Sequence, residues 1–198
     1  MQALFHIHGL RRSGLEPVSF ELRAGECCVL GGPSGSGKTL LLRALADLDP
    51  SSGEVLLEGV GRDHIEAPIW RKRVGYLPSE SGWWAARVRD HFVDWSVLQP
   101  ALLGLPTSIG DQPVAQLSSG ERQRLALLRL LEGQPAVLLL DEPTSALDAA
   151  ATLAVEAMIA QRLQLGAGVV WVSHDNAQAQ RVATRRLSIE AGYVRSEP

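Results

Sequence analysis

Apolar positions along this chain fall into two kinds of group. Two continuous apolar runs, at residues 136–140 and 169–172, have the length of strands that are buried on both faces of a parallel sheet. Elsewhere the apolar residues recur at helical spacing, as over residues 40–48 and 149–163. Because strand and helix patterns alternate along the chain, the sequence predicts an α/β domain with a mainly parallel sheet.

The other elements follow from the same pattern and from turn residues. We expect further strands at residues 3–8, 17–22, 26–30, 54–58 and 74–77, a helix over residues 120–131, a short helix from Asp175 and a final hairpin through Ile189 and Val194. The strand at residues 3–8 is expected at a sheet edge, and Ser118 or Ser119 is expected to cap the helix at 120–131. Residues 80–116 are the least regular stretch. No repeat or linker divides the chain, so residues 1–198 are expected to form one domain.

Composition limits the classes of function. The chain has 198 residues, of which 45% are hydrophobic and 21% charged, as in folded globular proteins. No apolar run approaches the ~18 residues of a membrane-spanning helix, and residues 1–8 lack the pattern of a signal peptide. We therefore expect a cytoplasmic chain that reaches a membrane only through a partner. Its net charge of −3 gives no general attraction to nucleic acid, so no direct nucleic-acid partner is expected.

Lysine and cysteine are both scarce. Lys38 and Lys72 are the only lysines among 19 basic residues. Cys27 and Cys28 are neighbours on a predicted strand and should face opposite sides of the sheet. Their spacing fits neither a disulfide framework nor a metal site, so we expect both to be buried, reduced side chains.

The stretch after the strand at residues 26–30 has the Walker A pattern of a phosphate-binding loop. The residues expected to contact ATP there are Gly32, Pro33, Ser34, Gly35, Ser36, Gly37, Lys38 and Thr39. The glycines let backbone N–H groups converge on phosphate oxygens, and the following helix directs its positive end at the same anion. Lys38 is expected to neutralise the β- and γ-phosphates, and the Thr39 hydroxyl is expected to ligate Mg²⁺.

Two carboxylates follow the apolar run at residues 136–140, at the sheet edge where α/β proteins bind ligands. We expect Asp141 to hold hydrated Mg²⁺ and Glu142 to polarise the water that attacks the γ-phosphate. His174 should emerge at the same edge, where it is expected to contact the γ-phosphate or orient the water. Glu142, His174 and Lys38 are therefore the catalytic candidates. No role is assigned to the other histidines, His6, His8, His64 and His91.

Taken in order, these motifs resemble those of the ATP-binding cassette (ABC) ATPases. Residues 117–121, LSSGE, are similar to the family signature LSGGQ, with Ser for the first Gly and Glu for the Gln. Residues 145–148 are similar to the D-loop, and residues 173–175 to the H-loop. The resemblance extends from about residue 3 to residue 194. It implies a P-loop NTPase core with helices flanking the sheet, an N-terminal antiparallel β part, and a shortened helical subdomain inserted at residues 80–132.

The resemblance also implies a mechanism and partners. The signature helix of a second copy would contact ATP through the Ser118 hydroxyl and the Gly120 backbone, in a homodimer that encloses a pair of ATP molecules. Asp148 would line the interface between the sites. Opening and closing of the dimer would drive a separate multi-span membrane permease, with this chain on the inner face of the cell membrane. The residues do not distinguish import from export.

Three features depart from the family pattern. Ser79 stands where the Q-loop glutamine is usual, so Ser79 or Glu80 is a candidate for contact with Mg²⁺. The adenine-stacking aromatic is missing, and an Arg side chain is a candidate substitute. The residues in its region are Leu10, Arg11 and Arg12. The stretch at residues 80–116 has only 37 residues, fewer than the family usually carries before the signature.

Trp83 and Trp84 open this short stretch. They could anchor a partner helix, but a small subdomain needs large side chains in its own core, so core packing is the preferred interpretation. Two other functions compete with transport. One is a soluble ABC ATPase that acts on nucleic acid or ribosomes, which would usually carry coiled-coil or basic extensions. The other is a regulatory module that hydrolyses ATP slowly, against which Glu142 and His174 both argue.

Overall fold

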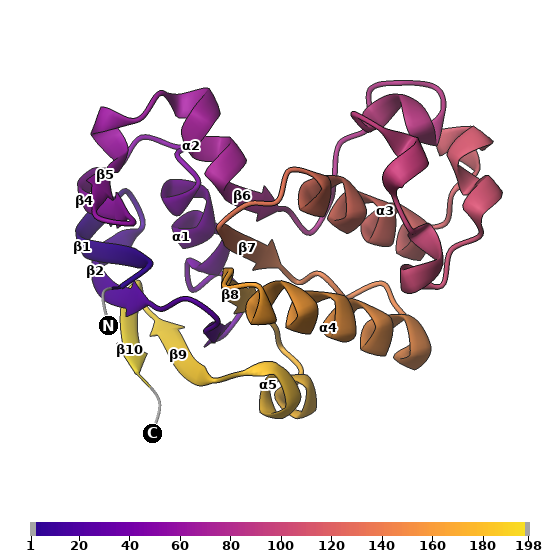
Figure 1. Ribbon diagram of the computed structural model, residues 1–198. Helices are drawn as coiled ribbons and strands as arrows, with labels where there is room; N and C mark the ends of the chain where they lie inside the picture. The colour runs from indigo at the N-terminus through magenta and orange to yellow at the C-terminus, as the bar shows by residue number, and fades with distance from the viewer. Residues whose placement is uncertain (1–2, 197–198) are drawn as a thin grey trace.

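The computed structural model describes residues 3–196, so the outer ends of the predicted domain, residues 1–2 and 197–198, lie outside the described region. Two sheets organise this region (Figure 1). The larger has six strands in the order β10-β9-β3-β8-β7-β6, and the smaller has four in the order β2-β1-β4-β5. Helices lie against the larger sheet, which gives the mixed α/β fold that the sequence predicts.

The larger sheet is parallel except at one edge. Its strands are β3 Cys27–Gly31, β6 Val74–Leu77, β7 Val137–Asp141, β8 Gly168–Val172, β9 Arg185–Glu190 and β10 Tyr193–Ser196. Only the pairing of β9 with β10 is antiparallel, and it forms the predicted C-terminal hairpin. Every residue of β7 and β8 is buried, as expected for central strands covered on both faces. The carboxyl ends of the parallel strands share one edge, and the predicted site residues follow there.

The smaller sheet is antiparallel and comes from the first third of the chain. Its strands are β1 Phe5–Arg12, β2 Leu15–Leu22, β4 Ser52–Leu57 and β5 Val60–Gly61. β1 pairs with both β2 and β4, so the prediction that residues 3–8 form an edge strand is wrong. Apolar and polar residues alternate in this strand because one of its faces is buried, through Phe5 and Ile7. This alternation does not indicate whether a strand pairs on one side or on both.

Five α-helices pack around the sheets within residues 3–196: α1 Lys38–Leu45, α2 Ala67–Arg73, α3 Ser119–Glu132, α4 Ala149–Gln164 and α5 Asn176–Val182. The sequence pattern does not predict α2, because this short helix buries only Trp70 and shows no helical periodicity. Of the two candidate caps for α3, Ser118 is the one that forms. No helix in the described part of the chain combines the length and the apolar character needed to cross a membrane.

Residues 80–116 contain 3-10 helices and neither an α-helix nor a ladder strand. These are η2 Val88–His91, η3 Trp95–Val97, η4 Pro100–Leu103, η5 Thr107–Asp111 and η6 Val114–Gln116, whereas η1 Arg62–His64 lies before α2. In Figure 1 this stretch lies beside α3, at the end of the molecule away from the smaller sheet. Pro100 begins η4, and prolines also precede η5 and η6, where a fixed φ and a missing N–H are tolerated.

The buried side chains form two clusters on opposite faces of the larger sheet. Cys28 belongs to the cluster shared with the smaller sheet, and Cys27 to the cluster beneath α3 and α4. Both cysteines are free and fully buried, which confirms the prediction. Burial raises the pKa of each thiol to about 12, so neither is a nucleophile near neutral pH.

Trp83 and Trp84 have different surroundings. Trp83 packs against the cluster beneath α3, whereas Trp84 is 73% exposed. The guanidinium of Arg129, from α3, lies 4.7 Å from the centroid of each indole ring, and His91 packs edge-on against both. The core interpretation is therefore confirmed for Trp83 and wrong for Trp84, because the second indole lies outside the cluster and has mainly these polar partners.

Candidate active site

The Walker A residues form the loop between β3 and α1. Gly32, Gly35 and Gly37 have left-handed φ values of 129°, 76° and 109°. A side chain on Gly32 would collide with the backbone carbonyl of Ile189, so the loop passes very close to strand β9. The chain then enters α1 at Lys38, whose first-turn N–H groups have no partner within the helix and face the loop. The backbone thus forms an anion site.

Lys38 is bound to its own loop. Its ammonium group donates to the carbonyls of Gly32 and Pro33, in each case over 2.8 Å. Burial lowers the pKa of Lys38, while the nearby carboxylates of Glu142 and Asp141 act in the opposite direction. The ammonium group is therefore hydrogen-bonded at the mouth of the loop to neutral carbonyls, which an entering anion can displace.

Asp141 ends β7 and accepts two hydrogen bonds on the same oxygen. The Thr39 hydroxyl donates to Oδ2 over 2.7 Å, and the Tyr76 hydroxyl donates to it over 3.2 Å. Thr39 and Asp141 supply the hard oxygen atoms that Mg²⁺ prefers, so this pair fits a magnesium ion. Among residues 3–196 no group of three or more His, Cys, Asp or Glu side chains could hold a metal ion, so water and phosphate would supply the other ligands.

Tyr76 is a site residue that the sequence reasoning missed. Burial, followed by the adjacent Asp141 carboxylate, raises the pKa of Tyr76, so the phenol stays protonated and remains a donor. Tyr76 pairs with Leu139 across β6 and β7, and Asp141 lies two residues further along the same face. The signal was therefore the strand order, which the sequence alone does not supply.

Glu142 and His174 meet at the carboxyl ends of β7 and β8. His174 Nε2 lies 3.2 Å from Glu142 Oε1, and both side chains are partly exposed, at 45% and 35%. Glu142 has a left-handed φ of 51°, which is uncommon for a residue other than glycine. Its N–H donates to the carbonyl of Val172 over 3.1 Å, which fixes the turn to the neighbouring strand.

Gln123 of α3 also holds this turn and was not predicted from the sequence. Its side-chain N–H donates to the carbonyl of Glu142 over 2.8 Å, and its oxygen accepts from the N–H of Ala146 over 3.1 Å. Only 7% of Gln123 is exposed. A glutamine in a helical position flanked by charged residues gives no sequence signal of burial, because the helix face that it occupies depends on packing.

One cavity of about 280 Å³ brings the main candidates together. It is lined by Ser34, Gly35, Gly37, Lys38, Thr39, Leu40, Asp141, Glu142 and His174. Gly32 and Pro33 do not line this cavity, but their carbonyls accept from Lys38, which does. Within the loop, the Ser36 N–H donates to the Pro33 carbonyl over 3.2 Å. Four kinds of group therefore face the same space. They are the backbone N–H groups that can bind phosphate, the Lys38 ammonium group, the Thr39 and Asp141 oxygens that can ligate a metal ion, and the Glu142–His174 pair.

The signature residues lie outside this cavity, at the start of α3. The Ser118 hydroxyl accepts from the Glu121 N–H over 3.2 Å and donates to the Glu121 carboxylate over 2.8 Å. The Ser118 N–H also donates to the Glu121 carboxylate over 2.8 Å, and this bond, followed by that from the hydroxyl, holds the pKa of Glu121 below its usual range. A Cβ on Gly120 would lie 3.0 Å from the Ala146 carbonyl, so α3 begins close to the D-loop. Asp148 caps α4 by accepting from the Ala151 N–H over 2.8 Å.

Ser79 and Glu80 do not reach the Asp141 cavity. They line a separate cavity of about 550 Å³, together with Arg122, Gln123 and residues of the D-loop. Among the candidates for adenine contact, Leu10 is fully buried, and the Arg12 guanidinium pairs with Asp49 over 2.5 Å. Of those three, this arrangement leaves Arg11 as the exposed side chain.

Comparison with known proteins identifies the family. A family model described as ABC transporter matches residues 15–145, which is about two thirds of the chain. The chain belongs to the ABC transporter family. Two solved structures show the same fold. An ATP-binding subunit of an ABC transporter aligns with a TM-score of 0.81 at 21% identity, covering 98% of this chain and 90% of that one. A bacterial Atm1-family ABC exporter aligns with a TM-score of 0.82 at 23% identity, covering 95% and 37%.

Similar proteins include ATP-binding subunits of the ABC family. The probable iron export ATP-binding protein FetA of Escherichia coli is 38% identical over 175 residues, covering 81% of this chain and 78% of FetA. The cytochrome c biogenesis ATP-binding export protein CcmA of Bordetella bronchiseptica is 34% identical over 210 residues, covering 98% and 93%. Protein STAR1 of Oryza sativa is 37% identical, but the chain spans only 56% of its length. The chain is thus a P-loop ATPase of the ABC transporter family.

Proposed function

We propose that this chain binds Mg²⁺ and ATP in the cavity beside the Walker A loop, hydrolyses the ATP, and thereby drives a separate multi-span membrane permease. The observation that carries the proposal is the meeting of Lys38, the Thr39–Asp141 pair and the Glu142–His174 pair around one cavity. The relatives support it, since FetA and CcmA are named as export ATP-binding proteins and CysA as an import one. Because both directions occur among these names, the proposal does not include a direction.

Binding follows from the groups that face the cavity. The N–H groups of the loop and of the first turn of α1 donate to the β- and γ-phosphate oxygens. Lys38 exchanges its bonds to the Gly32 and Pro33 carbonyls for stronger, charge-assisted bonds to phosphate. The Thr39 hydroxyl and the Asp141 carboxylate hold Mg²⁺, with Tyr76 keeping Asp141 oriented. When bound, the ion neutralises charge on the phosphate oxygens.

Hydrolysis requires water to attack in line with the bond that breaks. Glu142 polarises this water and accepts its proton, so that a bond forms from the water oxygen to the γ-phosphorus. The bond from the γ-phosphorus to the bridging oxygen breaks, and the products are ADP and inorganic phosphate. His174 Nε2 faces the Glu142 carboxylate across the observed 3.2 Å contact in the free chain, and its N–H donates instead to a γ-phosphate oxygen when ATP is bound.

A second copy of the chain completes each site in this proposal. The Ser118 hydroxyl and the Gly120 N–H of one copy contact the γ-phosphate bound by the other, with the N-terminus of α3 directed at the anion. Ser118 then turns its hydroxyl away from Glu121, its partner in the free chain. Asp148 lies at the interface between the two sites.

The remaining parts of the proposal concern organisation and location. Residues 1–198 act as one domain, within which residues 80–132 form the shortened helical subdomain that meets the permease. The chain lies in the cytoplasm, against the inner face of the cell membrane, and has no nucleic-acid partner. Ser79 is left out of the metal site, because it lines a different cavity.

The test compares ATP hydrolysis by the wild-type chain and by Glu142→Gln, with Glu16→Gln on the exposed face of β2 as the matched control. We expect kcat to fall at least about 100-fold in Glu142→Gln, while ATP binding stays within a few-fold. The same variant should accumulate as a dimer in gel filtration when ATP is present. Hydrolysis no faster in the wild type than in Glu142→Gln would contradict the enzymatic role and favour a regulatory module, and a persistent monomer would contradict the shared sites.

A further inference from the structure

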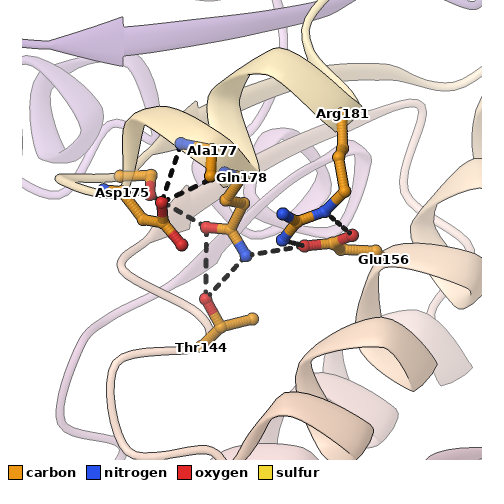
Figure 2. A network of polar contacts seen from close by, with 7 residues as sticks. Thr144, Glu156, Asp175, Ala177, Gln178 and Arg181 are labelled. Atoms are coloured by element: carbon orange, nitrogen blue, oxygen red, sulfur yellow. Dashed lines mark hydrogen bonds and ion pairs between the residues drawn. The ribbon is translucent and has the colours of Figure 1, made fainter.

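Gln178 is a buried polar residue with no part in the proposed function. It lies on α5, four residues after His174, and only 1% of it is exposed. Burying an amide costs free energy unless its donors and acceptor are satisfied. Figure 2 shows that the Gln178 side chain points from α5 into the space between α4 and the loop that carries Thr144.

The contacts of Gln178 determine which way its amide faces. Its Nε2 donates to Glu156 Oε1 over 3.0 Å, and a carboxylate can only accept. Its Oε1 accepts from the Ser173 hydroxyl over 2.9 Å. The Thr144 hydroxyl lies within 3.2 Å of both amide atoms, at 3.0 Å from Nε2 and 3.2 Å from Oε1. No other uncharged side chain of this length offers a donor on one side and an acceptor on the other.

The groups that hold Gln178 are themselves fixed. Arg181 donates to both oxygens of Glu156, over 2.7 and 3.0 Å, and so anchors that carboxylate on α4 (Figure 2). The backbone of α5 is capped by Asp175, whose carboxylate accepts from the N–H groups of Ala177 and Gln178 over 2.8 and 3.2 Å. The amide therefore extends from a rigid base.

The two loops that Gln178 joins are the loops of the candidate catalytic pair. Ser173 directly precedes His174, and Thr144 lies two residues after Glu142. A cavity of about 250 Å³ is lined by these residues and by Gln178. Beside the backbone bond from Glu142 to Val172, the Gln178 amide is therefore a second polar link between the two loops.

We propose that Gln178 is a positioning residue, which holds the His174 loop and the Glu142 loop in register so that the imidazole and the carboxylate stay in contact. This inference rests on the proposed function for its effect on hydrolysis. The structural effect on the two loops does not depend on it.

The proposal is tested by the kinetics of two variants. One is the single variant Gln178→Glu, and the other, the exchange variant, combines Gln178→Glu with Glu156→Gln. The single variant has the same shape, but it faces one carboxylate with another and removes the donor. We expect kcat to fall about 10- to 100-fold with KM for ATP within about 3-fold, because the Walker A contacts are untouched. The exchange variant restores a donor–acceptor pair between α5 and α4 and should recover most of kcat.

The matched control is Glu26→Gln, which removes the carboxylate that pairs with Arg185 over 2.7 Å on the opposite side of the larger sheet. It weakens an arginine–carboxylate pair of the same kind, and kcat should stay unchanged. An unchanged kcat in Gln178→Glu, or a loss that the exchange variant does not reverse, would overturn the inference.

Amide hydrogen exchange gives a readout that is independent of ATP hydrolysis. The Glu142 N–H donates to the Val172 carbonyl and the Asp175 N–H to the Ser173 hydroxyl. Both should exchange at least about 10-fold faster in Gln178→Glu, with β3 unaffected, and recover in the exchange variant. If the wild type fails to hydrolyse ATP, the proposed function is wrong, and this measurement still decides whether Gln178 holds the loops. Unchanged exchange rules it out.

Discussion

The larger sheet and the stretch at residues 80–116 are held together in different ways. β7 and β8 are buried along their whole length and pack in two apolar clusters. Residues 80–116 contribute to only one of these clusters, through the buried side chains of Val88, Leu103, Leu105 and Ile109 and several half-buried ones packed against them. Figure 1 shows the two regions as arrows in the sheet and as short coiled ribbons joined by loops beside α3. The central strands are thus covered on both faces, whereas the other stretch combines apolar packing on one side with individual polar contacts.

One histidine carries several of those polar contacts. His91 Nε2 accepts from the N–H groups of Trp84 and Ala85 over 3.0 and 2.9 Å, and Nδ1 lies 3.0 Å from the Arg87 carbonyl. Two backbone donors on Nε2 require the tautomer with the proton on Nδ1. On the other side, Glu132 of α3 accepts from the N–H groups at residues 93 and 94. Such contacts order a chain locally without a large apolar core.

The largest expected difference is in chemical protection. The Cys27 and Cys28 thiols should react with a maleimide only when the sheet unfolds, because they are buried and burial raises their pKa to about 12. The new thiol of Val97→Cys, at a position 68% exposed in η3, should react at once. We expect rates that differ by at least about 1,000-fold, measured by mass spectrometry of timed samples. Equal rates would show that the sheet does not protect its buried thiols.

The next effect is on global stability. Trp171 of β8 is fully buried, so Trp171→Ala should lower the free energy of unfolding by about 3–5 kcal/mol. Denaturant unfolding followed by circular dichroism measures this loss. A cost below about 1 kcal/mol would mean that the sheet tolerates a cavity, which central strands packed on both faces should not.

A local effect is expected at His91. His91→Ala leaves the N–H groups of Trp84 and Ala85 without their acceptor and should cost about 1–3 kcal/mol. Amide exchange should accelerate at residues 82–92 and stay the same in β7 and β8. His8→Ala, on the exposed face of β1, is the control and should change neither region. Faster exchange throughout the sheet would show that the two regions unfold together.

Acid should loosen the sheet side of the molecule through Glu156. Burial raises the pKa of this carboxyl, but its bonds with Arg181 and Gln178 outweigh burial, and the net pKa is lowered. A lowered folded pKa contributes stability above the unfolded value of about 4.3, and that stability is lost as pH falls through the folded value. Thermal unfolding of wild type and Glu156→Gln should therefore converge as pH drops below about 4. A constant difference down to the acid limit would contradict the linkage.

The smallest effect is expected at Trp84. Because the indole is 73% exposed, Trp84→Ala should change the free energy of unfolding by less than about 0.5 kcal/mol. It is the matched partner of Trp171→Ala, measured in the same denaturant series. A loss comparable to that of Trp171→Ala would show that the Arg129 and His91 contacts make Trp84 part of a core.

The sheet and the stretch at residues 80–116 also differ in how well the sequence predicts their structure. The apolar runs at residues 136–140 and 169–172 differ from β7 and β8 only at their ends, because full burial leaves a continuous apolar record in the sequence. The turns at residues 80–116 had no such record. Their conformation depends on individual contacts, such as the two hydrogen bonds that His91 accepts from backbone N–H groups. No role was assigned to His91 from the sequence.

The site also contains residues that the sequence predicts and residues that it does not. Walker A and the residues after β7 and β8 could be predicted, since motif spacing and strand ends place them without knowledge of strand order. Tyr76, Gln123 and Gln178 could not. Each acts through a neighbour that is distant in sequence, on β7, at the D-loop or on α4, and only the packed structure shows which neighbour that is.

The left-handed backbone at Glu142 sets the stability of the chain against its proposed activity at a single position. A non-glycine residue in that conformation costs about 1–2 kcal/mol, and glycine would avoid the cost. Glu142→Gly should therefore fold at least as well as the wild type while it loses the proposed base. The wild-type chain therefore carries a carboxylate at φ 51° at a cost in stability, and the proposed role of Glu142 as the base would account for that cost.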